Sequence, residues 1–267
     1  MSSTLSSDGT GIGYTRSGEG PSLILVGGAF QYRAIDQSTA ELAGRLAPAF
    51  GVFHYDRRGR GESGDSAPYS VEREVEDLDA LISEAGGSAF VFGMSSGGAL
   101  ALEGAARGLA ITKLALYEPP FALDENSHDA PDDFLERLTE LNADGRPGDA
   151  VEYFLTTGLG MPREMVAEMR GAPVWPGFEA VAHTLVYDTM LMDGQDALVA
   201  HRVPTITQPV LLLDGGASPP WAAAAVDRLA ELLPHAERRT LAGQTHDVAA
   251  DALAPALEDF FSATVRV

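Results

Sequence analysis

The chain has 267 residues, of which 45% are hydrophobic, and its formal net charge is −21 at pH 7. This length suits a single α/β domain with its own core and room for one insertion. The absence of cysteine excludes disulfides, thiolate metal sites and a cysteine nucleophile. Strong negative charge disfavours nucleic acid, anionic membranes and highly anionic substrates as partners, because all three would be repelled.

No targeting or membrane-spanning segment is predicted. The first residues contain neither the basic region nor the apolar core of a secretory signal. No stretch approaches the roughly 20 consecutive apolar residues that a spanning helix needs. We therefore expect a cytoplasmic protein without a membrane partner, and the oligomeric state is left open.

Strands and helices alternate along most of the chain. Residues 3–6 and 11–17 predict a hairpin around a Ser-Asp-Gly turn. Later apolar runs predict buried parallel strands, and apolar residues at helical spacing predict the helices between them. The order predicts an α/β fold with a mostly parallel eight-stranded sheet and helices on both faces. The later strands are expected at 22–26, 51–55, 88–92, 113–117, 209–213 and 237–241, and helices at 40–46, 71–82, 99–106, 221–233 and 253–261.

The segment 121–203 interrupts this alternation. It has no convincing strand, and helical patches are expected at 134–141, 150–156, 164–169 and 178–185. An insertion between two parallel strands would lie over the carboxyl edge of the sheet, where ligands bind in open α/β folds. We predict a helical cap at 121–203, between core segments 1–120 and 204–267, and expect it to supply an apolar wall of a substrate pocket.

The rest of the chain is organised around Ser95. A β-prone run at 88–92 leads into Gly-Met-Ser-Ser-Gly at 93–97, and a helix of small residues follows. Such a reversal strains the backbone at its apex, and a Cβ at position 93 or 97 would collide with a neighbouring strand or helix. The turn raises the Ser95 hydroxyl above the sheet edge, beside the Ser96 amide and a helix N-terminus. This pattern is typical of the nucleophile elbow of a serine hydrolase, and its context disfavours a plain Gly/Ser turn.

Several motifs together resemble the α/β-hydrolase superfamily over almost the whole chain. They are the elbow, the Gly-Gly-Ala strand end at 27–29, the Asp-Arg-Arg-Gly-Arg-Gly-Glu-Ser run at 56–63, the late His246 and the helical insertion. A serine nucleophile needs a base, and this superfamily places its histidine in a loop before the last helix, where His246 lies. The resemblance implies that the amides of Ala29 and Ser96 form an oxyanion hole.

The acid of the triad departs from the commoner pattern. Most relatives carry Asp a few residues beyond the strand at 209–213, where this chain has Ser218, and a hydroxyl cannot stabilise an imidazolium as a carboxylate does. Glu118 is the preferred acid, because it ends a strand beside the elbow strand and the following prolines should keep it extended. The alternatives are that Asp214 is the acid or that there is none. In a purely structural role, Glu118 would form a salt bridge to Arg58 or to a neighbour of Arg58.

A narrower resemblance is to the zearalenone lactonases. These enzymes have a similar elbow, take the triad Glu from this strand end and lack the usual Asp. Their cap carries a Pro-Val-Trp that is similar to residues 173–175. The likeness implies a triad of Ser95, Glu118 and His246, with Trp175 against the substrate. The loop at 26–30 differs from theirs, which leaves the substrate open. Further candidates for the lining of the pocket are Gly28, Phe30, Tyr32 and His183.

These roles predict a serine hydrolase that cleaves a carboxylic ester or lactone of a hydrophobic small molecule through an acyl-enzyme, with no metal or cofactor. Serine at position 95 argues against haloalkane dehalogenase and epoxide hydrolase chemistry, both of which use a carboxylate nucleophile. The missing Asp at position 218 keeps a second class open. That class is a ligand-binding protein, or a lyase or cyclase of secondary metabolism, on the same fold.

Overall fold

The structure is a computed structural model that describes residues 2–121, 130–193 and 198–263. The strands of this part of the chain form one sheet in the order β1-β2-β4-β3-β5-β6-β7-β8. β2 pairs antiparallel with β1 and β4, and all other pairs are parallel. The predicted mostly parallel eight-stranded sheet is confirmed. Its strands are β1 (Ser2–Leu5), β2 (Gly11–Ser17), β3 (Ser22–Val26), β4 (Gly51–Tyr55), β5 (Ala89–Met94), β6 (Ile111–Tyr117), β7 (Val210–Gly215) and β8 (Ala236–Leu241).

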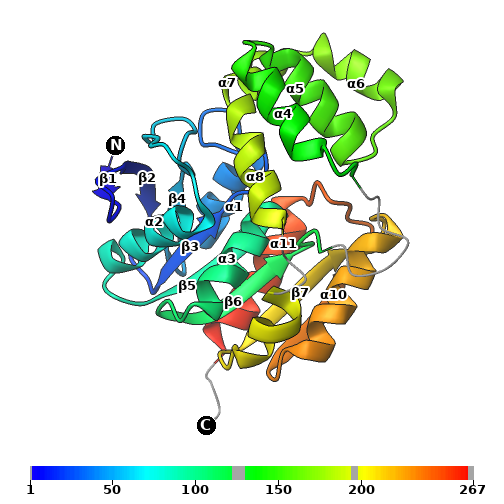
Figure 1. Cartoon of the computed structure of the whole chain (residues 1–267). Coiled ribbons are helices and arrows are strands. Elements are labelled where there is room, and N and C mark those ends of the chain that lie inside the picture. Colours follow the sequence, from blue (N-terminus) through cyan, green and yellow to red (C-terminus); the bar gives the residue numbers. More distant parts are fainter. Residues whose placement is uncertain (1, 122–129, 194–197, 264–267) are drawn as a thin grey trace.

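Helices cover both faces of the sheet (Figure 1). One face packs against α2, α3 and α10 through side chains such as Leu78, Leu100 and Val226. The other packs against α1 and α11, where Leu46 and Leu257 are fully buried. Strands covered on both faces read as continuous apolar runs, which is why the sequence revealed them. The helices are α1 (Gln37–Leu46), α2 (Val71–Glu84), α3 (Ser96–Ala106), α10 (Pro220–Leu232) and α11 (Ala250–Ser262).

The N-terminus of α1 lies earlier than its apolar pattern predicts. The helix begins at Gln37 rather than at residue 40, because Asp36 caps it. The Asp36 carboxylate accepts a hydrogen bond from the Thr39 amide at 3.0 Å, which satisfies one of the free donors of the first turn. Among the described residues, every helix is too short or too polar to traverse a lipid bilayer.

Between β6 and β7 the secondary structure of the described residues is entirely helical. We call these helices, α4 to η4, the cap. Figure 1 shows α4 to α7 gathered beyond one edge of the sheet, with α8 running back toward the core, where it contacts α3. The cap has a hydrophobic cluster of its own that includes Phe134, Phe154 and Leu185. Its elements are α4 (Phe134–Ala143), α5 (Pro147–Tyr153), η1 (Phe154–Gly158), α6 (Arg163–Arg170), α7 (Trp175–Ala180), η2 (Ala182–Thr184), α8 (Leu185–Met192), η3 (Leu198–Arg202) and η4 (Val203–Thr205).

The patch predicted at 178–185 is helical but is not one continuous helix. α7 ends at Ala180, the chain turns through η2, and the new helix α8 begins at Leu185. The bounds of the cap at 121–203 stay a prediction. Residues 122–129 and 194–197 of that range lie outside the described residues, as do residues 264–267 of the predicted second core segment.

Candidate active site

Ser95 occupies the sharp turn between β5 and α3. Its backbone has φ 52° and ψ −128°, a conformation that non-glycine residues adopt only when their surroundings enforce it. The Ser95 amide donates to the carbonyl of Tyr117 at 2.9 Å. A Cβ on Gly97 would lie 2.3 Å from the Val26 oxygen, and one on Gly93 would lie 2.6 Å from the Gly97 oxygen. Both glycines are therefore required by close backbone approach, and the strand–turn–helix geometry of an elbow is present.

Two backbone amides lie next to this turn. A Cβ added to Gly28 would be 3.0 Å from the Cβ of Ser95, so the loop after β3 abuts the serine directly. The Ala29 amide of that loop donates to no acceptor within the described part of the chain. The Ser96 amide is the first of α3 and has no intrahelical partner. These free donors and the positive end of the α3 dipole can stabilise negative charge beside Ser95.

Glu118 and His246 are brought together from distant parts of the chain. Glu118 follows β6 directly, is fully buried, and places Oε2 at 2.7 Å from Nδ1 of His246. Its Oε1 accepts a hydrogen bond from the Gly215 amide at 2.7 Å. Burial alone would raise the pKa of Glu118, but the hydrogen bonds from His246 and Gly215 outweigh it and hold the pKa below its usual value. The carboxylate is therefore charged at neutral pH and faces the imidazole.

The backbone of Glu118 differs from the expectation. The prolines that follow predict an extended residue, but Glu118 has φ 44°, in the left-handed region. Its amide donates to the carbonyl of Leu213 at 3.0 Å, while its carboxylate is held at the other end. These hydrogen bonds to the Glu118 amide and carboxylate outweigh the preference of a residue before proline for an extended backbone. Backbone strain at a buried carboxylate is characteristic of a functional position.

The loop that carries His246 is tied to the sheet. The Tyr117 hydroxyl donates to the carbonyl of Thr245 at 2.6 Å, and the Ala217 amide donates to that of Gln244 at 2.8 Å. This loop follows β8 and Ser95 follows β5, so the serine and the imidazole leave the same edge of the parallel strands. The His246 side chain is 40% exposed, which leaves the ring open toward solvent or a substrate.

Asp214, the other carboxylate considered for the acid, has different partners. Asp214 accepts from the Thr240 hydroxyl at 2.9 Å and lies 3.5 Å from the Arg238 guanidinium. Arg58, the structural partner considered for Glu118, is instead paired with Asp77 at 2.6 Å. Of the two candidate acids, Glu118 is the one in contact with His246.

A model of the alpha/beta hydrolase family matches residues 23–256, which is most of the chain. The chain belongs to the alpha/beta hydrolase family. It is 54% identical to an alpha/beta hydrolase from Sphaerobacter thermophilus DSM 20745 over 98% of this chain and all of that one, and the two structures superimpose with a TM-score of 0.92.

Other relatives of this alpha/beta hydrolase carry more specific names. The pimeloyl-[acyl-carrier protein] methyl ester esterase of Xanthomonas oryzae pv. oryzae (strain MAFF 311018) is 30% identical over 240 residues, which span 86% of this chain and 89% of the esterase. The enol-lactonase of Burkholderia xenovorans LB400 has a TM-score of 0.72 over 98% of this chain and 100% of its own. At 22% identity, the second likeness supports the fold alone.

The pocket residues predicted for the alpha/beta hydrolase lie in two different settings. Phe30, at φ 63°, packs against the cap, with its ring centroid 4.7 Å from that of Phe178. Trp175 is buried in the same cluster, and its indole N–H donates to Glu179 at 2.9 Å. His183 has a 45% exposed side chain and lies 3.6 Å from Asp65. The proposed contacts of Gly28, Phe30, Trp175 and His183 with substrate stay predictions.

Sequence reasoning missed Trp221 near the candidate site, and it noted Ser218 only as the residue in place of the usual Asp. Trp221, 38% exposed at the start of α10, has its ring centroid 5.8 Å from that of His246, so the two rings form one exposed aromatic face. The Ser218 hydroxyl is buried and makes no hydrogen bond of normal geometry with a described residue, yet it lies close enough to Glu118 to favour the charged carboxylate. An aromatic residue directly after the Ser-Pro-Pro turn was the available signal for Trp221.

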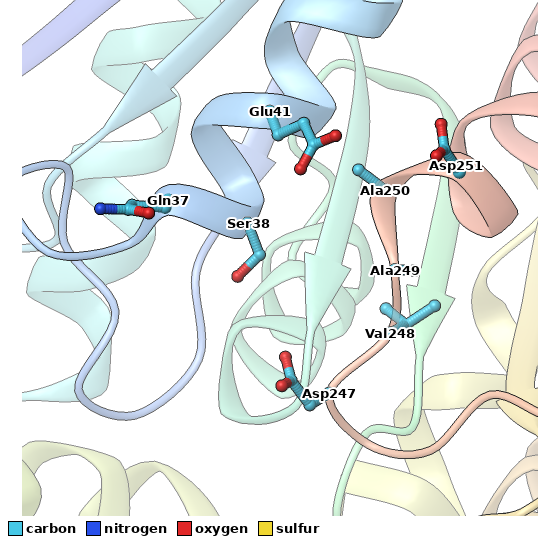
Figure 2. A pocket seen from close by; sticks show the side chains of 8 residues that line it. All are labelled: Gln37, Ser38, Glu41, Asp247, Val248, Ala249, Ala250 and Asp251. Atoms are coloured by element: carbon cyan, nitrogen blue, oxygen red, sulfur yellow. The ribbon is translucent and has the colours of Figure 1, made fainter.

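Asp247, the neighbour of His246, faces a separate hollow on the surface of the alpha/beta hydrolase. This hollow has a volume of about 390 Å³. Figure 2 shows its lining side chains between the start of α1 and the start of α11. Among its described lining residues are Glu41, Asp247 and Asp251, and Asp251 pairs with Arg45. The residues that line it do not include Ser95, Glu118 or His246. Asp247 therefore belongs to an acidic surface hollow.

Proposed function

We propose that this alpha/beta hydrolase cleaves a carboxylic ester or lactone of a hydrophobic small molecule through an acyl-enzyme on Ser95. The observation that carries the proposal is the 2.7 Å contact between Nδ1 of His246 and the buried Glu118 carboxylate, at the edge of the sheet where Ser95 sits in a strained turn. An ordinary serine hydroxyl is a weak nucleophile, and a base oriented by a buried carboxylate is the arrangement that activates it.

The first half of the reaction forms the acyl-enzyme. With Nδ1–H donating to Glu118, the lone pair of Nε2 is the base that accepts the Ser95 hydroxyl proton. Ser95 Oγ attacks the carbonyl carbon, and the negative charge on the carbonyl oxygen is held by the amides of Ala29 and Ser96. The imidazolium then returns the proton to the leaving alkoxide, and the bond between the carbonyl carbon and that oxygen breaks. For a lactone, the released alcohol remains attached to the acyl group.

The second half regenerates the serine. A water molecule gives a proton to His246 and adds to the acyl carbon, and the same two amides hold the second oxyanion. The proton returns to Ser95 Oγ as the acid leaves. Through both halves Glu118 keeps its charge and stabilises the imidazolium, which a neutral side chain at this position could not do.

The substrate class rests on the surroundings of the serine and on the relatives. The loop after β3 packs Ala29 and Phe30 against the aromatic cluster of the cap, which favours an apolar substrate over a charged one. The net charge of −21 disfavours polyanionic substrates. The name of the Xanthomonas relative, a methyl ester esterase, supports carboxylic ester chemistry. The resemblance to zearalenone lactonases adds lactones to the substrates to be tested.

A fluorophosphonate probe tests the proposal, because it phosphonylates an activated serine whatever the natural substrate. We expect the wild-type protein to be labelled and Ser95→Ala to remain unlabelled at equal folded content. A screen of aryl esters, lactones and thioesters with the same pair of proteins then assigns the substrate class. A well-folded wild-type sample that resists the probe and cleaves none of these compounds would instead indicate a ligand-binding protein or a lyase.

A further inference from the structure

The geometry points to Arg60 as a positioning residue that fixes the orientation of the Ala29 amide, and to the cap as the part of the molecule that holds Arg60 in place. This inference rests on the proposed function, because it concerns the oxyanion hole. It adds a role for a buried ion cluster that the catalytic triad does not include. The cluster is formed by Arg57, Arg60, Asp188 and Glu74.

The first step concerns the peptide unit between Gly28 and Ala29. A trans peptide is planar, and its C=O and N–H point in opposite directions. Nη1 of Arg60 donates to the Gly28 carbonyl oxygen at 2.5 Å. The guanidinium thereby fixes the direction of the Ala29 N–H on the other side of the same plane. A donor locked in advance is the kind of group that stabilises an oxyanion without reorganisation during the reaction.

The Ser96 amide is fixed by the same principle. It shares a peptide plane with the Ser95 carbonyl, which accepts a hydrogen bond from the Gly98 amide at 2.8 Å. The turn itself therefore orients this donor. The Gly28 carbonyl in the Ala29 loop has a longer turn hydrogen bond, from the Gln31 amide at 3.3 Å, so the 2.5 Å bond from Arg60 is the one that fixes this plane most firmly.

The next step is what holds Arg60. Its Nη2 donates to Asp188 Oδ2 at 2.6 Å, and its Nε donates to the Thr184 hydroxyl at 3.1 Å. Asp188 belongs to α8 and Thr184 to η2, so both partners come from the cap. Arg60 is 1% exposed and Asp188 is 2% exposed, which keeps water from competing for these bonds. The guanidinium therefore bridges the cap and the oxyanion loop.

The same carboxylate also reaches the other side of the proposed oxyanion hole. Asp188 Oδ1 accepts from the Ser96 hydroxyl at 2.7 Å and from Nη1 of Arg57 at 2.7 Å. Asp188 of the cap thus binds the Ser96 side chain directly. Through Arg60 it also reaches the peptide that carries the Ala29 amide. A cluster that only attached the cap to the core would have no need to include these two groups.

The experiment compares Arg60→Met with Arg58→Met. Both arginines belong to the run at 56–63, are fully buried and form ion pairs. Arg58, however, is bound to Asp77, Asp8 and the carbonyl of Arg73, and not to the oxyanion loop. Both variants are expected to lose stability. The readouts are kcat and KM for p-nitrophenyl butyrate and the inhibition constant of a butyl trifluoromethyl ketone, which forms a tetrahedral oxyanion adduct with the serine. Thermal melting gives the folded fraction.

For Arg60→Met we expect kcat/KM to fall about 100-fold, the inhibition constant to rise by a similar factor and KM to change less than about threefold, because a misdirected donor affects the oxyanion and not the ground state. For Arg58→Met the ratio of the inhibition constant to KM should stay at the wild-type value. Equal effects of the two substitutions on that ratio would overturn the inference. So would a folded Arg60→Met that keeps wild-type affinity for the ketone.

If Arg60→Met does not fold, Thr184→Val takes its place, because it removes the acceptor of Arg60 Nε, together with the hydroxyl's own bond to the Val181 carbonyl, and leaves every charge. It should weaken ketone binding and kcat/KM in parallel, by about three- to tenfold, and unchanged values would contradict the inference. Failure of the proposed function is recognised separately. If the proposed function is wrong, the wild-type protein neither reacts with a fluorophosphonate nor cleaves the ester. If only the inference about Arg60 is wrong, the wild type is active and the comparison of the variants fails.

Discussion

Glu118 and Asp188 are two buried carboxylates that differ in the cationic group that each one binds. Glu118 is bound by one backbone amide and by the imidazole of His246, whose side chain is 40% exposed. Asp188 is bound by two buried guanidinium groups and a hydroxyl. Burial raises the pKa of each carboxyl, and in each case the partners reverse the effect: His246 lowers the pKa of Glu118, and Arg60 and Arg57 lower that of Asp188.

The difference lies in whether the partner can exchange a proton. An imidazole gains and loses a proton in the physiological range, whereas a guanidinium stays charged. Glu118 can therefore stabilise a positive charge that appears and disappears during a reaction. Asp188 holds a fixed charge balance, which suits a structural and orienting role. The predictions below test this division of roles, from the largest expected free-energy effect to the smallest.

Asp188→Ala should have the largest effect on stability. It leaves Arg60 buried without a counter-ion, and breaking a buried ion pair in this way costs about 3–5 kcal/mol. The measurement is the free energy of unfolding in urea. The matched control is Glu140→Gln, which removes an exposed pair with Arg137 and should change that free energy by less than about 1 kcal/mol. If both variants change the free energy of unfolding by a similarly small amount, Asp188 does not have the structural role that distinguishes it from Glu118.

Glu118→Gln should lower kcat/KM for an aryl ester at least ~100-fold, which corresponds to about 2.7 kcal/mol in the transition state. The amide retains the shape of the side chain but cannot stabilise the imidazolium, and KM should change little. Asp214→Asn is the control, because its carboxylate is bound to Thr240 and Arg238 instead of His246. If Asp214→Asn loses the activity and Glu118→Gln keeps it, the assignment of the acid is wrong.

Much of the fold could be predicted from the sequence, because its signals are local. Strands β3 and β7 are continuous apolar runs, and the glycines at 93 and 97 have a single steric explanation that the structure supports. The start of α1 was missed, although Asp36 was a readable cap. The bounds of α7 and α8 were missed because an apolar stretch of this length does not reveal where a helix breaks.

The candidate site could be predicted only in part, because its contacts are long-range. The position of Glu118 beside the elbow strand followed from the order of the strands, but its positive φ did not, since hydrogen bonds from Gly215 and His246 override the local preference. Asp188 stands alone in the apolar helix Leu185–Met192, a sign of a buried partner. Its partner Arg57 lies 131 residues away in the sequence, which spacing arguments cannot bridge.

Moving the carboxylate should restore part of the activity that Glu118→Gln loses. By the superfamily resemblance, Ser218 occupies the position of the usual acid, and its buried hydroxyl has no hydrogen bond of normal geometry among the described residues. Adding Ser218→Asp to Glu118→Gln should recover about tenfold in kcat/KM, measured with the same aryl ester. In the wild-type background the same substitution should reduce stability, because two carboxylates would then lie side by side. Absence of any recovery would indicate that position 218 does not face His246.

The smallest predicted effect is the pH dependence that Glu118 contributes to stability. Its pKa is lowered in the folded protein from the ordinary value of 4.5, so the unfolded chain takes up the proton first as the pH falls. The stabilisation from Glu118 is therefore fully present above about pH 5 and is lost as the pH falls through the folded pKa. Glu118→Gln has no such proton to bind. The difference in unfolding free energy between wild type and Glu118→Gln, measured in urea from pH 7 down to pH 4, should accordingly shrink on acidification, and a difference that grows would mean that the buried carboxylate is held neutral.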